Sequence, residues 1–395
     1  MDFNFSEDQN ILKDTVRKFA ESVISPKINE MRKARRIPES VYEGMSKLGI
    51  MGMTVPEKFG GMGSDALTTG IVAGEIGRAD PTASIPVLFL VDNAWSYLLS
   101  KYGNPAVFSG LLKDVSKGKK LIGIASTEAG HGSDVVGIDT VAVKRGNEYI
   151  VNGEKSYISL VRDIKERSGG YVTVVKTDKN AGSRGLSLLY IPYSDDIEVS
   201  YLEEMGREGS SWGTLRFNDL HVPAENIIGQ ENKGFNIVHE GFEFARGLIS
   251  VISASAALKS IENGINYMKQ RKAFGKEIAT FEGLQFQVAD DVAKMEAALS
   301  FAYKALWVYD EEQKKGKFDR FYVSKSIAMA KLTCTTWAFD AINDALQWQG
   351  AFGYSKDCPE EWALRGIRSF QLAEGSREIM KMIVARESIG KEYMK

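Results

Sequence analysis

Apolar residues recur along this chain at two different spacings, and the change of spacing divides it into three parts. From residue 1 to 120 and again from 233 to 395 they recur every three or four positions, which predicts amphipathic helices. Between 121 and 232 they stand in short runs rich in β-branched and aromatic side chains, which predicts strands. The first helix follows Ser6 and Gln9, which together have the pattern of a capping box.

The individual elements follow from the same patterns. Helices are predicted at 38–49, from 66 onward, at 85–99, 284–306 and 319–349, within 358–373 and at the C-terminus. Strands are predicted at 121–126, 171–176, 186–191 and 214–222, with a hairpin around a Gly-Asn turn in VAVKRGNEYIVN. Helices and strands that are segregated along the chain predict an α+β fold, with a helical domain on either side of a β domain.

The composition is that of an ordinary soluble protein, and it narrows the range of partners. Hydrophobic residues make up 44% and charged residues 26% of the 395 positions. A formal net charge of −2 argues against nucleic acid as a partner. The longest central run without Asp, Glu, Lys or Arg, Gly247–Leu258, is too short to span a bilayer. The sequence opens on MDFNFSEDQ rather than on a basic and apolar leader, so we expect a cytoplasmic protein with no membrane span.

Cysteine and histidine give no sign of a metal or a disulfide framework. Cys334 and Cys358 have no CxxC spacing, and the three histidines are scattered. No metal site is therefore predicted.

A glycine-rich segment, Gly130–Val135, resembles a dinucleotide-binding loop only superficially. That loop requires a helix directly after it, because the helix N-terminus holds the pyrophosphate. Here a strand pattern follows, so the Rossmann interpretation is rejected. The loop 127–134 is still able to cradle a ligand through its backbone N–H groups.

Glu374 is the strongest candidate for chemistry. It is followed by Gly375, which accepts unusual backbone angles, and by Ser376, a good N-cap for the last helix. The positive end of that helix stabilises negative charge by about 0.3–1 kcal/mol, so we expect the carboxylate to stay ionised. An ionised carboxylate that a substrate can desolvate suits a general base. The alternative is a solvated loop glutamate beside a helix cap.

Six motifs occur in the order and spacing of one family. They are PEKFGGMG at 56–63, TEAGHGSD at 127–134, NGEKSYIS at 152–159, RKAFGK at 271–276, QWQGAFGY at 347–354 and AEGSREI at 373–379. Over essentially its whole length the chain resembles the acyl-CoA dehydrogenases, flavoproteins of β-oxidation and related pathways. The resemblance implies a helical N-terminal domain, a β-barrel-like middle domain and a C-terminal four-helix bundle, with FAD between the last two.

The resemblance also implies roles for individual residues. Thr127 would hydrogen-bond the flavin ring, Tyr157 would stack on it, and Ser159 would donate a hydrogen bond. The residues implied to bind FAD are Ile124, Ser126, Thr127, Gly132, Ser133, Tyr157, Ser159, Arg271, Phe274, Gln347, Gly350, Ser376 and Glu378. Among them Arg271, Phe274, Gln347 and Gly350 would reach the FAD of a neighbouring subunit. The residues implied to bind substrate are Ser133, Glu243, Arg246 and Gly375.

Glu374 falls where most members of the family carry the catalytic base. Some relatives use a Glu immediately before the position of Arg246, but here that position is Ala245. The resemblance implies that Glu374 removes the α-proton of an acyl-CoA while the flavin takes the β-hydride. It also implies an electron-transfer flavoprotein as partner and a homotetramer as the assembly.

Two other activities remain open at this point. The same fold can run as an enoyl-CoA reductase, because the flavin potential is not legible in a sequence. A non-catalytic acyl-CoA-binding scaffold is the third reading, although the intact Glu374-Gly375-Ser376 stretch argues against it. Glu282 and Glu378 stand where the family usually has Gln, and extra acids near a diphosphate should weaken FAD binding.

Asp92 interrupts an otherwise apolar predicted helix, PVLFLVDNAW. A buried carboxylate is costly unless it is paired or its pKa rises. One expectation is a Lys or Arg partner, or solvent. The other is that Asp92 belongs to the substrate-binding residues and points into the acyl pocket, where Ala373 replaces the family's usual Tyr and leaves room. The second expectation favours a branched or cyclic acyl group.

Overall fold

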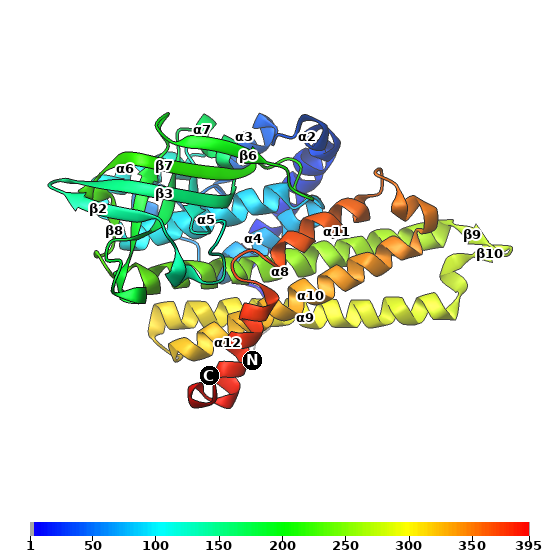
Figure 1. Ribbon diagram of the computed structural model, residues 1–395. Coiled ribbons are helices and arrows are strands. Elements are labelled where there is room, and N and C mark those ends of the chain that lie inside the picture. Colours follow the sequence, from blue (N-terminus) through cyan, green and yellow to red (C-terminus); the bar gives the residue numbers. More distant parts are fainter. Residues whose placement is uncertain (1–3, 395) are drawn as a thin grey trace.

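The computed structural model describes residues 4–394, and its helices and strands follow the predicted order of helical, β and helical regions (Figure 1). The first region consists of α1 (Glu7–Phe19), α2 (Ile28–Ala34), α3 (Glu39–Lys47), α4 (Ala66–Ala79), α5 (Ser84–Tyr102) and α6 (Pro105–Ser116). The predicted capping box is confirmed, since Ser6 and Gln9 exchange side-chain and backbone hydrogen bonds at the start of α1. Asp65 caps α4 in the same way by accepting from the Thr68 N–H.

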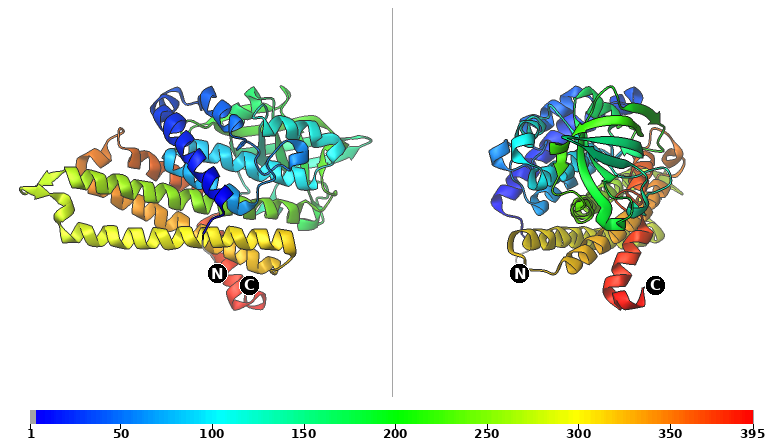
Figure 2. Two further views of the ribbon diagram at one scale, coloured as in Figure 1. Left: turned by 180° about the vertical axis from the view of Figure 1, so that it is seen from behind. Right: turned by 60° about the vertical axis from the view of Figure 1, so that its left-hand side comes forward.

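The middle region is one curled sheet, visible in the right-hand view of Figure 2. Its strand order is β6-β7-β3-β2-β4-β5-β8, and β1 pairs with β4 in parallel. The strands are β1 (Ile122–Ala125), β2 (Val141–Arg145), β3 (Glu148–Ser159), β4 (Gly170–Lys176), β5 (Leu186–Pro192), β6 (Glu198–Leu202), β7 (Trp212–Pro223) and β8 (Ile227–Ile228). The loop that resembles a dinucleotide site is followed by a three-residue 3-10 turn (Val135–Gly137) and then by β2, with no α-helix, so its rejection is confirmed.

One helix inside the β region was not predicted. The helix α7 (Val161–Glu166) follows β3 directly, and Leu160 takes a left-handed backbone conformation where the strand ends. Its six residues are too few to show a helical period, so the sequence pattern did not reveal it.

The last region consists of α8 (Gly234–Gln270), α9 (Glu282–Lys315), α10 (Arg320–Trp348), α11 (Pro359–Phe370) and α12 (Arg377–Ile389). A small hairpin, β9 (Lys272–Ala273) and β10 (Lys276–Glu277), joins α8 to α9. The adjoining ends of these two helices and the hairpin project beyond the body of the molecule (Figures 1 and 2). We call this projection the arm.

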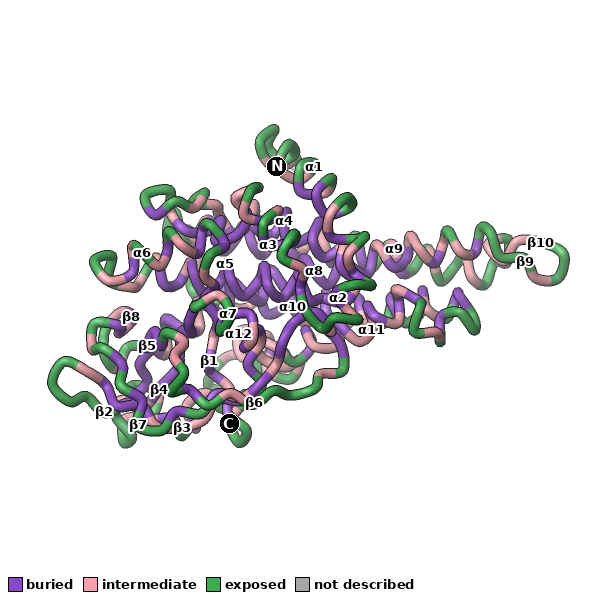
Figure 3. The backbone as a smooth tube through the Cα atoms, turned by 90° about the horizontal axis from the view of Figure 1, so that it is seen from above, coloured by how far each residue is buried: buried purple, intermediate pink, exposed green. Residues whose placement is uncertain are grey.

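The helix α8 is the centre of the fold, and it is buried along most of its length (Figure 3). By length and composition it is apolar enough to cross a membrane, but 94% of its most apolar window is buried by other parts of the protein. Burial of this kind is typical of a core helix in a globular protein. Gly77 of α4 allows α4 and α8 to approach closely, because a Cβ at this position would lie 3.0 Å from the Ile252 carbonyl oxygen.

Candidate functional site

Glu374 lies in the tight turn between α11 and α12. Its φ is +56°, a left-handed conformation that a side chain other than glycine rarely adopts, and Gly375 follows at +103°. Ser376 then caps α12, with its Oγ accepting from the Ile379 N–H at 3.4 Å. The predicted turn and cap are therefore confirmed, and the backbone at Glu374 is held in a conformation that costs about 1–3 kcal/mol.

Gly375 is required by both its conformation and its surroundings. A Cβ at this position would lie 3.1 Å from the Met380 Cε and 3.3 Å from the Arg246 Nη2. Its φ is itself unfavourable for any L side chain. The glycine thus lets the buried guanidinium of Arg246 approach the turn.

Two buried cations hold the carbonyl oxygens of this turn. Arg246 of α8 donates from Nε to the Glu374 carbonyl oxygen at 2.7 Å. Lys331 of α10 donates from Nζ to the carbonyl oxygens of Ala373, at 2.5 Å, and of Gly375. Arg246 is 4% exposed and Lys331 is 1% exposed. Three successive carbonyl groups are therefore directed into the protein and satisfied there.

The Glu374 carboxylate itself is left without a partner. Its Oε2 is buried, and no donor reaches it from the residues that the structure describes. Burial raises the pKa of Glu374 to about 7, while the positive charges of Arg246 and Lys331 oppose that rise. The expectation that the helix N-terminus keeps this carboxylate ionised is thus too simple, because desolvation is the larger effect. A carboxyl group that titrates near neutral pH is suited to accept and release a proton.

Arg246 and Glu243 were predicted to contact coenzyme A. In the structure the buried Arg246 donates to the Glu374 carbonyl oxygen, and its guanidinium lies 5.8 Å from the centre of the Phe242 ring. Glu243 is buried, which raises its pKa, and a hydrogen bond from Ser324 together with the nearby Arg246 opposes the rise. Arg246 therefore supports the Glu374 turn, and the contact of both residues with coenzyme A stays a prediction.

The loop after β1 is held by a buried ion pair that sequence reasoning missed. Lys155 of β3 donates to the Ser126 carbonyl oxygen and to the Glu128 Oε1, each at 2.9 Å. Glu128 also accepts from the Thr140 N–H at 3.0 Å. The Thr127 carbonyl accepts from the Ser156 N–H, so the loop is fixed on both sides of Thr127. The missed signal was a lysine within an otherwise strand-like stretch.

The end of β3 places Tyr157 and Ser159 beside this loop. Tyr157 has a left-handed φ of +63°, and its ring is half exposed and packs 5.2 Å from the Trp212 ring. Ser159 accepts from the Arg207 Nη1 at 3.3 Å. Of the remaining predicted residues here, Ile124 lies on β1, while Gly132 and Ser133 are exposed in the loop. A half-exposed aromatic ring and the exposed residues Gly132 and Ser133 thus lie near the end of β3.

The other predicted cofactor residues are distributed over two places. Arg271 and Phe274 lie on the arm, and the Phe274 side chain is 95% exposed with a φ of +53°. Gln347 and Gly350 are exposed at the end of α10, next to the arm. Ser376 and Glu378 lie at the start of α12, where the exposed Glu378 has a lowered pKa because of local hydrogen bonds.

Asp92 is buried in α5, but its contacts are not those that the sequence suggested. Its Oδ2 accepts from the Gly52 N–H at 2.8 Å, and the Ile122 N–H also stabilises the charge. Burial nevertheless raises the pKa of Asp92 to about 7. The charge of Arg167 opposes that rise, but no hydrogen bond or ion pair joins Asp92 to a cationic side chain within residues 4–394. These contacts favour a structural role for Asp92, because its hydrogen-bond partners are backbone groups of the N-terminal region and β1.

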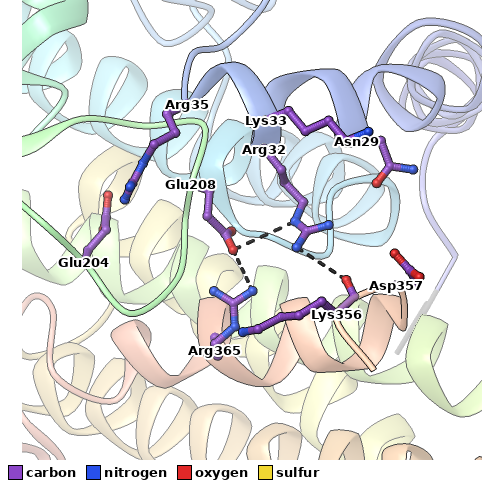
Figure 4. Close-up of a pocket in the computed structure, with 9 residues that line it drawn as sticks. All are labelled: Asn29, Arg32, Lys33, Arg35, Glu204, Glu208, Lys356, Asp357 and Arg365. Carbon is purple, nitrogen blue, oxygen red and sulfur yellow. Dashed lines mark hydrogen bonds and ion pairs between the residues drawn. The ribbon is translucent and has the colours of Figure 1, made fainter. Parts of the chain in front are cut away.

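A polar cavity of about 640 Å³ lies elsewhere, between α2, the β6–β7 loop and α11 (Figure 4). Its walls carry both signs of charge, and Glu208 bridges Arg365 at 2.5 Å and Arg32 at 3.8 Å. None of the predicted site residues lines it. In the part of the chain that the structure describes, no three His, Cys, Asp or Glu side chains gather in a way that could hold a metal.

Comparison with known families agrees with the architecture. Family models of the acyl-CoA dehydrogenase N-terminal, middle and C-terminal domains match residues 6–119, 123–220 and 232–389, respectively. The acryloyl-CoA reductase (NADH) of Anaerotignum propionicum is 32% identical, covering 98% of this chain and 96% of that protein. The glutaryl-CoA dehydrogenase of Desulfococcus multivorans is 31% identical, covering 99% and 98%.

A solved structure has the same fold over nearly its whole length. It is described as "Electron transferring flavoprotein of Acidaminococcus fermentans: Towards a mechanism of flavin-based electron bifurcation", and its matching chain has a TM-score of 0.91 at 29% identity, covering 98% of this chain and 99% of that one. The match to all three domain descriptions, together with the turn at Glu374, shows that this chain is an oxidoreductase belonging to the acyl-CoA dehydrogenase family.

Proposed function

We propose that the protein catalyses the FAD-dependent α,β-dehydrogenation of an acyl-CoA thioester, with Glu374 as the base. The observation that carries this proposal is that neither carboxylate oxygen of Glu374 accepts a hydrogen bond within residues 4–394, although Oε2 is buried and burial raises the pKa of the group to about 7. A structural carboxylate in such a place is expected to accept at least one hydrogen bond, as Asp92 does from the Gly52 N–H, because an unpaired buried group is costly. An α-proton of a bound substrate would supply the missing partner.

The side chain and the backbone of Glu374 have separate roles in this reaction. Glu374 takes the α-proton, and the electron pair of that C–H bond forms the new double bond to the β-carbon. Among the hydrogen bonds of residues 4–394, none uses the N–H of Glu374 or Gly375 as a donor. The Glu374 N–H is therefore free to donate to the thioester carbonyl oxygen as negative charge develops there.

FAD fits the residues present at the end of β3 and in the Thr127 loop. The loop is fixed by Lys155, while a Cβ at Gly132 would meet only one atom, at 3.9 Å, so its surroundings are open. Tyr157 presents a half-exposed ring beside it. When bound, FAD accepts the hydride that leaves the β-carbon. We propose that these residues, with Ser126 and Ser159, hold the flavin.

One relative supports the reverse reaction, reduction of an enoyl-CoA, as a second candidate function. A relative with 32% identity acts as an acryloyl-CoA reductase, so the fold and the base are compatible with reduction of an enoyl-CoA. In that direction Glu374 would donate a proton to the α-carbon, and a pKa of about 7 suits either role.

The acyl group is proposed to be branched or cyclic. This proposal now rests on Ala373 alone, a small side chain directly before the base, since Asp92 has structural contacts. A panel of straight, branched and cyclic acyl-CoAs at equal concentration is the direct measurement. Faster turnover of the straight saturated chains would contradict the proposal.

The arm suggests how the protein assembles. Phe274 is 95% exposed and Tyr354 94% exposed, and both lie at the arm or the loop beside it. We propose a homotetramer in which this surface contacts a neighbour and completes its FAD site, with an electron-transfer flavoprotein as the redox partner in the cytoplasm. A monomeric mass by light scattering with FAD fully retained would contradict this assembly.

The test of the reaction is spectroscopic. Purified, FAD-supplemented protein is expected to be yellow, and its flavin band is expected to bleach when an acyl-CoA is added without an electron acceptor. Enoyl-CoA added to the pre-reduced protein measures the opposite direction. A colourless protein, or a flavin that neither addition changes, would refute the proposal.

A further inference from the structure

Lys331 is a buried cation and is not among the site residues that the sequence predicts. It lies on α10 within the apolar stretch SIAMAKLTCTTW and is 1% exposed. Its ammonium group donates to the carbonyl oxygens of Ala373 and Gly375. No carboxylate side chain contacts it among the described residues, so its charge is directed at the backbone of the turn rather than at a salt-bridge partner.

The peptide groups that Lys331 contacts are those that matter for the proposed reaction. The Ala373 carbonyl and the Glu374 N–H belong to one peptide group, so a cation on the oxygen polarises the N–H at the other end. The Glu374 N–H is the proposed donor to the thioester oxygen. In the same way Arg246, on the Glu374 carbonyl, polarises the Gly375 N–H.

The position of Lys331 also explains why the unfavourable backbone conformation persists. Glu374 has a φ of +56°. The carbonyl groups of its turn point into the protein, where Lys331 and Arg246 are their hydrogen-bond donors. Hydrogen bonds to a charged donor are roughly twice as strong as those between neutral groups. The flanking carbonyls at 373 and 375 share one ammonium group, which fixes the direction of the peptide between them.

We propose that Lys331 is a positioning residue for the reaction: it orients and polarises the Glu374 peptide so that its N–H stabilises the enolate form of the substrate. The proposal rests on the proposed function, in which Glu374 is the base. The charged groups that act on the Glu374 carboxylate are Arg246 from α8 and Lys331 from α10. Burial and the like charge of Arg246 lower the pKa of Lys331 to about 7, while the negative charge of ionised Glu374 opposes that fall.

The experiment compares two CoA probes of the same chain length on the FAD-loaded protein. Acetoacetyl-CoA ionises to an enolate whose oxygen needs the N–H donor, whereas S-butyl-CoA, a thioether, has no carbonyl oxygen at that place. Lys331→Met is expected to weaken binding of acetoacetyl-CoA about tenfold, less than the 10²–10³-fold that loss of a whole oxyanion donor costs. Binding of S-butyl-CoA is expected to change less than about twofold, since it does not use the polarised N–H.

Two further sets of variants separate positioning from simple stability. Ile342→Ala removes a buried side chain from the same helix, eleven residues and about 16 Å along its axis, and it should weaken neither probe selectively. Lys331→Gln keeps a neutral hydrogen-bond donor and Lys331→Arg keeps a charged one. The loss of affinity for acetoacetyl-CoA is therefore expected to be largest for Met, smaller for Gln and smallest for Arg. Equal weakening of both probes, no change in either, or equal losses in all three Lys331 variants would overturn the proposal.

The same probes distinguish a failure of this proposal from a failure of the proposed function. Acetoacetyl-CoA ionises in solution, so its binding does not require Glu374 as a base. If Glu374→Gln kept full turnover, the base would be misassigned, yet the selective effect of Lys331→Met on the enolate would still be measurable. If Glu374→Gln lost turnover and Lys331→Met bound both probes like the parent, only the role of Lys331 would be lost.

Discussion

Two buried carboxyl groups of this chain have nearly the same titration behaviour but opposite surroundings. Burial raises the pKa of both Asp92 and Glu374 to about 7, and each keeps one oxygen without a partner. Asp92 receives backbone N–H groups directly on its carboxylate. Around Glu374 the donors contact the backbone carbonyls and leave the side chain free. The place of the hydrogen-bond donors, rather than the pKa, therefore distinguishes a structural acid from a reactive one.

The strongest test of this contrast is Glu374→Gln. The amide keeps the size of the side chain but cannot accept a proton, so turnover is expected to fall by about 10²–10⁴-fold. Stopped-flow reduction of the bound flavin measures the loss, and the flavin absorbance and melting temperature should stay close to those of the parent. Turnover above a tenth of the parent rate would place the base elsewhere.

Gly375→Ala changes the turn without touching a carboxylate. The added Cβ would lie 3.1 Å from the Met380 Cε at a φ of +103°, so the variant is expected to lose about 1–3 kcal/mol of stability. Turnover is expected to fall about tenfold as the neighbouring base shifts, in line with the sensitivity of catalysis to small displacements. Thermal unfolding and steady-state rates measure the two effects, and Gly283→Ala, where a Cβ meets no atom within 4 Å, is the control. A variant with parental turnover would show that the turn tolerates displacement.

The rising limb of the pH dependence of catalysis should follow Glu374 and not Asp92. Because the base must be ionised, kcat/KM is expected to rise with pH through an apparent pKa near 7. The profile of Asp92→Asn should show the same limb, because Asp92 lies outside the reaction. A limb that disappears in Asp92→Asn would contradict the contrast between the two acids.

Asp92→Asn is expected to have its effect on stability and little on rate. The folded-state pKa of Asp92, about 7, lies above the ordinary value of 3.8. Its contribution is therefore fully present below about pH 4 and is lost as the pH rises through about 7. The Asn variant, which cannot ionise, should lose less stability than the parent between pH 4 and 8 in chemical denaturation, with turnover changed less than about twofold. A steeper pH dependence in the variant would reverse this assignment.

Elements with long, regular patterns were predictable from the sequence. The stripe at 284–306 became part of α9, and the Gly-Asn turn at 146–147 became the β2–β3 hairpin. The Ser376 cap was legible because capping is a local interaction between residues three apart. The short helix α7 was not legible, since six residues do not establish a period.

The residues that support the Glu374 turn could not be predicted from local sequence patterns. Lys331 and Glu374 are 43 positions apart, and only the packing of α10 against the turn brings them together. A lysine inside an apolar helical stripe was a visible anomaly, yet the sequence does not say which partner such a charge meets. Asp92 shows the same limit, because its partners are backbone groups, which leave no trace in side-chain patterns.

The arm has a consequence for how the protein behaves on dilution. It holds Phe274 almost entirely in solvent in a single chain, next to the residues proposed to complete a neighbour's FAD site. Under that assembly, association and cofactor binding are linked by mass action, so each stabilises the other. The activity of each molecule is then expected to fall as the enzyme is diluted and to recover when free FAD is added, which makes specific activity depend on concentration.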